Sequence, residues 1–239
     1  MDSLSLHTSP FIIEGVEFTS EEIIDVMTGY VGEDRQEKIE RVVSERTYTV
    51  VPVTEGLFDR GNVSAVMRSA EALGYQSMHI IESAKRFKKA NRVTQGADKW
   101  LDLKRWDNTQ PCIDHLRSKG YRIVVTHMSE TAKPIDEVSF TQPTAIFFGN
   151  EKEGVSPELV EQADDCVVIP MTGFAQSFNI SVAAALTLYH IHHERARELG
   201  KHGDLTTEEH KGLIASYYMR TVTHAEDILL RHKLDNHQE

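Results

Sequence analysis

The sequence of 239 residues has only two cysteines, Cys112 and Cys166, which lie far apart and match no metal-binding or redox spacing. This scarcity excludes a disulfide scaffold. Its apolar runs stay well short of the roughly 18 residues needed to span a bilayer, and its first residues lack the basic and apolar regions of a secretory signal. We therefore expect an intracellular protein, in the cytoplasm, or in an organelle if a transit peptide has been removed.

Several common functional motifs are also missing. No G-x-G-x-x-G follows the first strand-like run, and neither G-x-x-x-x-G-K-[ST] nor G-x-S-x-G occurs. Their absence disfavours dinucleotide-binding enzymes, P-loop enzymes and α/β-hydrolases. The chain has 12 histidines but no H-E-x-x-H and no paired Cys/His spacing, so we expect no metal site.

Positive charge is scarce as well, since 26 Lys and Arg stand against 37 Asp and Glu, a net charge of −11. Such a balance disfavours nonspecific binding to nucleic acid. One segment departs from it: residues 85 to 105 hold eight Lys or Arg against two Asp. The charge alone is compatible with a solvated face or with a surface that follows RNA phosphates.

The patterning indicates three parts. Residues 1–46 carry eleven acids against four bases and form an acidic helical arm. From 47 to 195, β-rich runs such as YTVVPV, SMHII, YRIVVTH, TAIFFG and CVVIP alternate with helical segments. This alternation predicts an α/β fold, a mainly parallel sheet with helices on both faces. Residues 196–239 form a helical C-terminal extension.

Three loops that follow predicted strands have unusual composition. In the first, Asn62 or Ser64 is expected to cap a helix that carries Arg68 one turn after Ser64. In the second, Gly149 and Gly154 enclose Glu151 before Ser156-Pro157 opens a helix. The third, IPMTGFAQSFN, leads into an apolar helix. Taken singly, these features are an ordinary surface arginine, a turn and a helix cap.

Taken together and in this order, the segments NVSAVMRSAEALG, FFGNEKEGVS and IPMTGFAQSFNISVAAAL resemble motifs 1, 2 and 3 of the SpoU family of RNA 2'-O-ribose methyltransferases, within the SPOUT class. The resemblance covers about residues 48 to 195 and is closest to the TrmH type, which methylates guanosine 18 of tRNA. It implies a deep trefoil knot at the carboxyl end of the sheet, S-adenosylmethionine as cofactor, and a homodimer that completes the active site.

Site residues follow from the resemblance position by position. It implies cofactor contacts for Thr126, Gly149, Ile169 and Phe178, and a catalytic group of Arg68, Asn62, Glu151, Ser177 and Asn179. Arg68 is expected to position a phosphate and polarise the hydroxyl, because a guanidinium is a poor proton acceptor. The basic segment then becomes an expected contact for tRNA through Lys85, Arg86, Lys88, Lys89 and Arg92.

The apolar helix from Ile180 to Ile191 is expected to be buried on every side, as knot core and dimer interface. Two alternatives to the tRNA reaction stay open. The acidity of both ends keeps a ribosomal RNA ribose or another tRNA position as a target. A noncatalytic RNA-binding protein on the same fold is disfavoured, because the catalytic group is intact.

Overall fold

The computed structural model describes residues 4, 5, 7, 9–57, 59–82, 96–129, 132–150 and 153–236. The chain forms two compact units, one of residues 1–4 and 47–202 and one of residues 5–46 and 203–239. In the part of the chain that is described, no helix combines the length and apolarity needed to cross a membrane.

The first unit is built on a seven-stranded sheet with the strand order β5-β4-β3-β8-β6-β9-β7. Every neighbouring pair that the structure describes is parallel, which confirms the predicted α/β class. The strands are β3 (Val50–Glu55), β4 (Ser77–Ile81), β5 (Asp102–Trp106), β6 (Arg122–Thr126), β7 (Lys133–Pro134), β8 (Thr144–Phe148) and β9 (Asp165–Val168).

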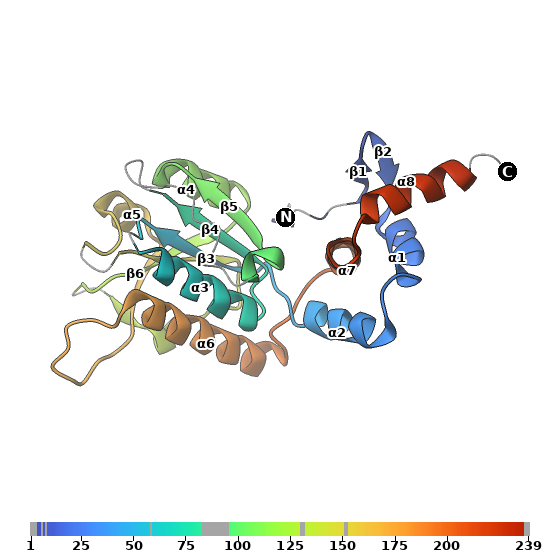
Figure 1. Ribbon diagram of the computed structural model, residues 1–239. Helices are drawn as coiled ribbons and strands as arrows, with labels where there is room; N and C mark the ends of the chain where they lie inside the picture. The colour runs from blue at the N-terminus through green and yellow to red at the C-terminus, as the bar shows by residue number, and fades with distance from the viewer. Residues whose placement is uncertain are drawn as a thin grey trace. The chain divides into compact units, whose positions relative to one another are not determined.

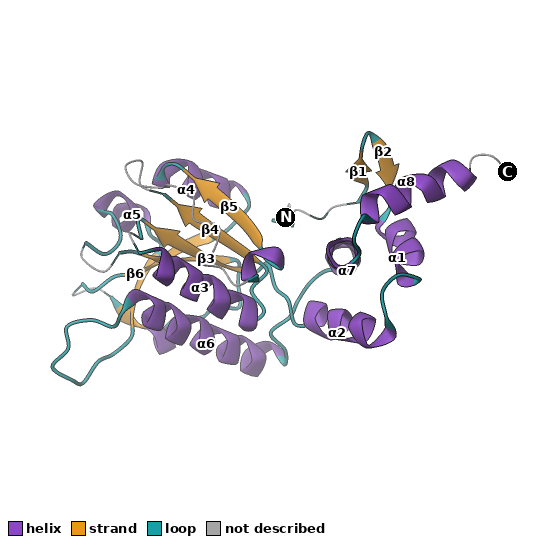
Figure 2. Cartoon of the chain, viewed as in Figure 1, coloured by secondary structure: helices purple, strands orange, loops and turns teal. Residues whose placement is uncertain are grey.

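Helices cover both faces of this sheet, as predicted (Figures 1 and 2). One face is covered by α3 (Arg60–Ala72) and α6 (Ile180–Leu199), which pack against each other. The other carries α4 (Thr109–Ser118) and α5 (Pro157–Gln162). Short 3-10 turns occupy Ala97–Lys99 and Ile135–Glu137.

Period-two alternation explains why both faces need a cover. Strand side chains that point to α3 and α6 include Met78, Val124 and Ile146, all fully buried. Their neighbours Ile123 and Phe147 point to the opposite face and are also fully buried. Strands that are apolar on both sides are typical of parallel sheets between two helical layers.

In its described residues, the second unit combines a small hairpin with four helices. The hairpin pairs β1 (Phe11–Ile13) with β2 (Val16–Phe18), and the sequence-based prediction of a purely helical arm missed it. The helices are α1 (Ser20–Thr28), α2 (Glu33–Ser44), α7 (Thr207–Thr221) and α8 (Ala225–Asn236). Within this unit α7 packs against α1, α2 and α8.

Candidate active site

A cavity of about 320 Å³ opens at the carboxyl ends of β6, β8 and β9. Ligands of parallel α/β sheets normally bind at this edge, and the volume lies within the range of small-molecule sites. Residues from four separated segments line it, after β6, after β7, after β8 and from β9 into α6: Thr126, His127, Met128, Ile135, Gly149, Asn150, Glu153, Gly154, Val167, Val168, Ile169, Met171, Ser177, Phe178, Ile180, Ala183 and Thr187.

The wall after β8 depends on two glycines. A Cβ added at Gly149 would lie 2.0 Å from the carbonyl carbon of Gly154 and 2.1 Å from the amide nitrogen of Val155. Gly154 has a φ of +70°, a conformation that side chains disfavour. Asn150 and Gly154 exchange two backbone hydrogen bonds of 3.0 Å, which close the turn between them. The chain therefore passes close to itself at the cavity wall.

A buried carboxylate holds the end of this loop. Glu55, at the end of β3, is 7% exposed and accepts hydrogen bonds of 2.8 Å from both the amide and the hydroxyl of Ser156. It also accepts one from the hydroxyl of Thr109 at the start of α4. Ser156 in turn caps α5 by accepting from the amide of Leu159. These hydrogen bonds fix the loop after β8, which holds the second motif, to the end of β3.

The first and third motifs meet through a side-chain contact. Asn179 caps α6 by accepting from the amides of Ser181 and Val182, and its side-chain amide donates to the Asn62 side chain at 3.4 Å. The prediction that Asn62 or Ser64 caps this helix was wrong. Asp59 is the N-cap of α3, and its side chain accepts a hydrogen bond of 2.7 Å from the amide of Gly61. Asn62 lies inside the helix, where its side chain contacts Asn179 of the third motif.

The predicted site residues fall into three groups. The four expected cofactor contacts and Ser177 all line the cavity. Asn62, Arg68 and Asn179 lie outside this lining, and Arg68 is an exposed residue of α3. The remaining residues lie outside the described part of the chain: Glu151, Lys85, Arg86, Lys88, Lys89 and Arg92.

The other twelve lining residues were not named as site residues by sequence reasoning, among them His127, Ile135 and Thr187. The helical period offered a signal for Thr187, since Ile180, Ala183 and Thr187 recur at three- and four-residue steps on one side of α6. Ile135 follows β7, a strand of two residues that is too short to recognise from a pattern. No feature of the sequence indicated that Ile135 lines the cavity.

The expected burial of α6 on every side is not met within the single chain. Ala184, Leu188 and Ile191 are fully buried on the side of α6 that joins the core. Val182, Leu186 and Tyr189, spaced by four and three residues along the helix, are 46%, 42% and 55% exposed. An apolar stripe on α6 therefore faces outward.

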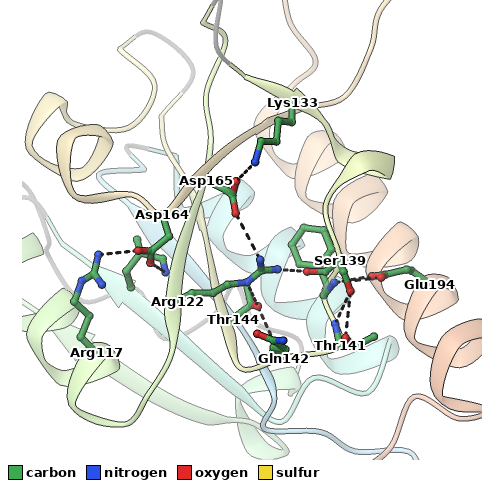
Figure 3. Close-up of polar contacts among 12 residues, drawn as sticks. Arg117, Arg122, Lys133, Ser139, Thr141, Gln142, Thr144, Asp164, Asp165 and Glu194 are labelled. Atoms are coloured by element: carbon green, nitrogen blue, oxygen red, sulfur yellow. Dashed lines mark hydrogen bonds and ion pairs between the residues drawn. The ribbon is translucent and has the colours of Figure 1, made fainter.

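A polar network fixes the opposite, amino-terminal edge of the sheet (Figure 3). Arg122 of β6 donates to the Thr144 hydroxyl at 2.8 Å and pairs with Asp165 of β9 at 3.6 Å. Lys133 of β7 pairs with the same carboxylate at 2.6 Å. Further along, the buried Glu194 of α6 accepts from the Phe140 amide at 3.0 and 3.2 Å. These contacts stabilise the scaffold at the edge away from the cavity.

Two large pKa shifts lie away from the cavity, between β4 and α4. Burial, with His115 and Lys104 nearby, lowers the pKa of His79 to about 3. Burial raises the pKa of the Cys112 thiol, whose sulfur lies 3.8 Å from His79 Nδ1. Both groups are neutral at pH 7, as expected for core residues.

The residues present fit a cofactor with an apolar ring system and polar or charged groups at its edges. Most of the cavity wall is apolar, and at Gly149 the backbone lies so close to Gly154 and Val155 that no side chain fits between them. Ser177, Asn150 and Glu153 add hydroxyl, amide and carboxylate groups. An apolar slot with a few convergent polar groups is typical of a small-molecule site.

A seven-stranded parallel sheet with this cavity at its carboxyl edge defines a class of α/β ligand-binding enzymes, and comparison with known proteins narrows the class. Residues 49–189 match the model of the SpoU rRNA Methylase family. This chain belongs to that family.

Among its relatives, a tRNA (guanosine(18)-2'-O)-methyltransferase of Borreliella burgdorferi is 35% identical over 199 residues, covering 83% of this chain and 91% of the relative. An Escherichia coli protein of the same name is 32% identical over 161 residues, covering 67% of this chain and 70% of the relative.

Two solved structures are similar as well. The TrmH/SpoU tRNA modifying enzyme of A. aeolicus has a TM-score of 0.71 and 31% identity, covering 80% of this chain and 98% of that one. The SpoU methyltransferase AviRb of Streptomyces viridochromogenes, in complex with the cofactor AdoMet, has a TM-score of 0.55 and 25% identity, covering 64% and 62% of the two chains.

Proposed function

We propose that this chain transfers a methyl group from S-adenosylmethionine to the 2'-hydroxyl of guanosine 18 in tRNA. The observation that carries the proposal is the cavity at the carboxyl ends of β6, β8 and β9, which all four expected cofactor contacts line. The relatives of known name act on this nucleotide, and one structural neighbour holds AdoMet.

The reaction needs positioning more than covalent chemistry. When bound, S-adenosylmethionine supplies a methyl carbon on a positively charged sulfur, and the carbon–sulfur bond breaks as the ribose oxygen bonds to that carbon. The chain has to hold the ribose in line with the methyl group and exclude competing water. Its site residues also have to let the hydroxyl proton leave, to water or to an RNA phosphate oxygen.

Arg68 is the proposed anchor for the target phosphate. A guanidinium stays protonated at neutral pH and presents a planar fork that matches two phosphate oxygens. Its exposure on α3 suits contact with a large external substrate. The Asn62–Asn179 contact joins α3 to the start of α6, and we assign it the role of fixing the arginine helix relative to the third motif. Ser177 and Glu151 complete the proposed catalytic group.

A second copy of the chain completes the proposed site. Arg68 lies outside the cavity lining of its own chain, so the proposal places Arg68 of the partner subunit beside the cofactor. The apolar stripe of Val182, Leu186 and Tyr189 supports a dimer interface on α6, because an exposed row of large apolar side chains gains stability when a partner covers it.

The proposed path of the chain includes a deep trefoil knot around this cavity. Its support is the resemblance of the three motifs to those of the SpoU family, because segments of the second and third motifs line the cavity together. Knots are rare exceptions among protein folds. An experimental structure with continuous density from β8 through α6 tests the threading directly.

We place the RNA contacts in the basic segment, at Lys85, Arg86, Lys88, Lys89 and Arg92. Five cations within eight residues, in a chain with a net charge of −11, supply a local surface for phosphates. The acidic residues 1–46, with eleven acids and four bases, favour one second candidate. That candidate is the same reaction on a ribosomal RNA ribose or another tRNA position.

The deciding experiment measures methyl transfer from labelled S-adenosylmethionine to an unmodified tRNA transcript, with Arg68→Ala as the matched variant. Nucleoside mass spectrometry then locates the mark. We expect 2'-O-methylguanosine at position 18 with the wild-type chain and none with the variant. A mark at another position, or only on ribosomal RNA, would favour the second candidate.

A further inference from the structure

One polar group of the cavity wall has no hydrogen-bond partner among the described residues. Thr187, in the middle of α6, is fully buried and lines the cavity (α6 in Figure 1). Its hydroxyl oxygen makes no hydrogen bond with any residue that the structure describes. A threonine inside a helix normally donates back to the carbonyl four residues earlier, so its unpaired hydroxyl is an exception.

Such an arrangement is costly unless a ligand completes it. A buried hydroxyl without a partner loses its hydrogen bonds to water and gains none in return. Valine has nearly the same shape and would fill the same volume without that cost. We therefore expect the hydroxyl to find its partner in a polar atom of whatever occupies the cavity.

The surroundings of Thr187 select the part of the cofactor that fits. The other most buried side chains of the lining are Ile135, Val167 and Ile180, with exposures of 6%, 1% and 8%. A charged amino-acid group or a sulfonium would lose its hydration among these apolar side chains without gaining a charged partner. A flat, neutral heteroaromatic ring with nitrogens on its edge loses little there, provided one edge atom finds a hydrogen bond.

We propose that the Thr187 hydroxyl is the hydrogen-bond partner of the adenine ring of the cofactor and thereby sets base specificity at the buried end of the cavity. The inference rests on the proposed function, because it assumes an adenosine-containing cofactor in this cavity. Thr187 acts in binding and takes no part in the methyl transfer.

The test uses calorimetry on the full chain with S-adenosylhomocysteine and four analogues: the 1-deaza, 3-deaza and 7-deaza forms and the form without the 6-amino group. Thr187→Val removes only the hydroxyl, whereas the control Thr187→Ser keeps it. We expect about tenfold weaker binding of S-adenosylhomocysteine by the valine variant, the usual worth of one hydrogen bond to a buried group. The serine variant should stay within about threefold of wild type.

The analogues identify the atom that is bound. At least one of them should bind the wild type about tenfold more weakly than S-adenosylhomocysteine. Thr187→Val should bind that analogue and S-adenosylhomocysteine equally well, because the hydroxyl and the missing adenine atom form one hydrogen bond. Without ligand, Thr187→Val should melt at the same temperature as wild type or higher, since it relieves an unpaired group.

Two results would overturn the inference alone: affinity of Thr187→Val within twofold of wild type, or a lower melting temperature of its ligand-free form, which would reveal an internal partner for the hydroxyl. Failure of the wild-type chain to bind any adenosine ligand would overturn the proposed cofactor together with the inference. The wild-type measurement therefore separates the two failures.

Discussion

The close approach at Gly149 leads to the sharpest prediction. In Gly149→Ala the new methyl group would lie 2.0 to 2.2 Å from three backbone atoms of Gly154 and Val155. Carbon atoms in contact are separated by at least about 3.5 Å, so the facing backbone has to move away by about 1.5 Å. No flexible side chain is available to absorb this shift.

The expected magnitude follows from what that backbone holds. Overpacking a close-packed site costs about 1 to 3 kcal/mol, and here the displaced turn, closed by the Asn150–Gly154 hydrogen bonds, is a wall of the cavity. We expect the free energy of unfolding to fall by about 2 kcal/mol. The affinity for S-adenosylhomocysteine should fall by about a hundredfold, equivalent to about 2.7 kcal/mol.

Gly173→Ala is the matched control. Gly173 lies in the exposed loop between β9 and α6, and a Cβ there meets nothing within 4 Å. We expect unchanged affinity and, at most, a gain of about 1 kcal/mol in stability from the less flexible unfolded chain. Urea unfolding and calorimetry measure both quantities. Cofactor affinity of Gly149→Ala within threefold of wild type, in a folded variant, would refute the reasoning.

Four further predictions concern other parts of the chain. Arg68→Lys keeps the charge but loses the planar fork, so methyl transfer should fall at least about a hundredfold while calorimetry shows unchanged cofactor affinity. Leu186→Glu should give a monomer by light scattering, because a charge replaces the centre of the apolar stripe on α6. Glu194→Gln should lower the free energy of unfolding by about 1 to 3 kcal/mol in urea titrations without changing cofactor affinity. Because the folded pKa of His79 is about 3 and an unfolded histidine titrates near 6.5, its contribution to stability is complete above pH 6.5 and falls as the pH drops toward 3, with about 2 kcal/mol lost by pH 5. His79→Gln should remove that part of the loss, which urea midpoints at pH 7.5 and 5 measure.

Each of these predictions has an outcome that contradicts it. Near-normal turnover of Arg68→Lys would end the phosphate-anchor assignment, and a dimeric Leu186→Glu would move the interface elsewhere. Loss of cofactor affinity in Glu194→Gln would show that the amino-terminal edge of the sheet influences the cavity. An identical pH dependence of wild type and His79→Gln would mean that the pKa of His79 does not change on folding.

Sequence patterns predicted five strands of the seven-stranded sheet, those with largely apolar sequences. Apolar runs of four to six residues between helical segments identified β3, β4, β6, β8 and β9. The hairpin of β1 and β2 was not predicted, because a strand of three residues is too short to show alternation of apolar and polar residues. The cap of α3 was misassigned within DRGN, where Asp59 and Asn62 both have side chains suited to the role.

The cavity was predictable only where a motif already marked it. Thr126, Gly149, Ile169, Ser177 and Phe178 were found through the resemblance, and they line the cavity. Residues that line it through tertiary packing alone carry no local signature. In the sequence an inward-facing threonine of an apolar helix cannot be told from a core residue, since the distinction depends on whether a partner lies beside its hydroxyl.

The two edges of the sheet divide stability from binding. At the amino ends of β6, β8 and β9, charged and hydroxyl side chains connect the strands to one another (Figure 3). At the carboxyl ends, glycines and backbone contacts form the cavity wall, and the side-chain hydrogen bonds of Glu55 hold the far end of the loop after β8. A substitution at Gly149 therefore displaces the binding wall while the opposite edge keeps the sheet folded. This division is the physical reason to expect that its effect on affinity exceeds its effect on stability.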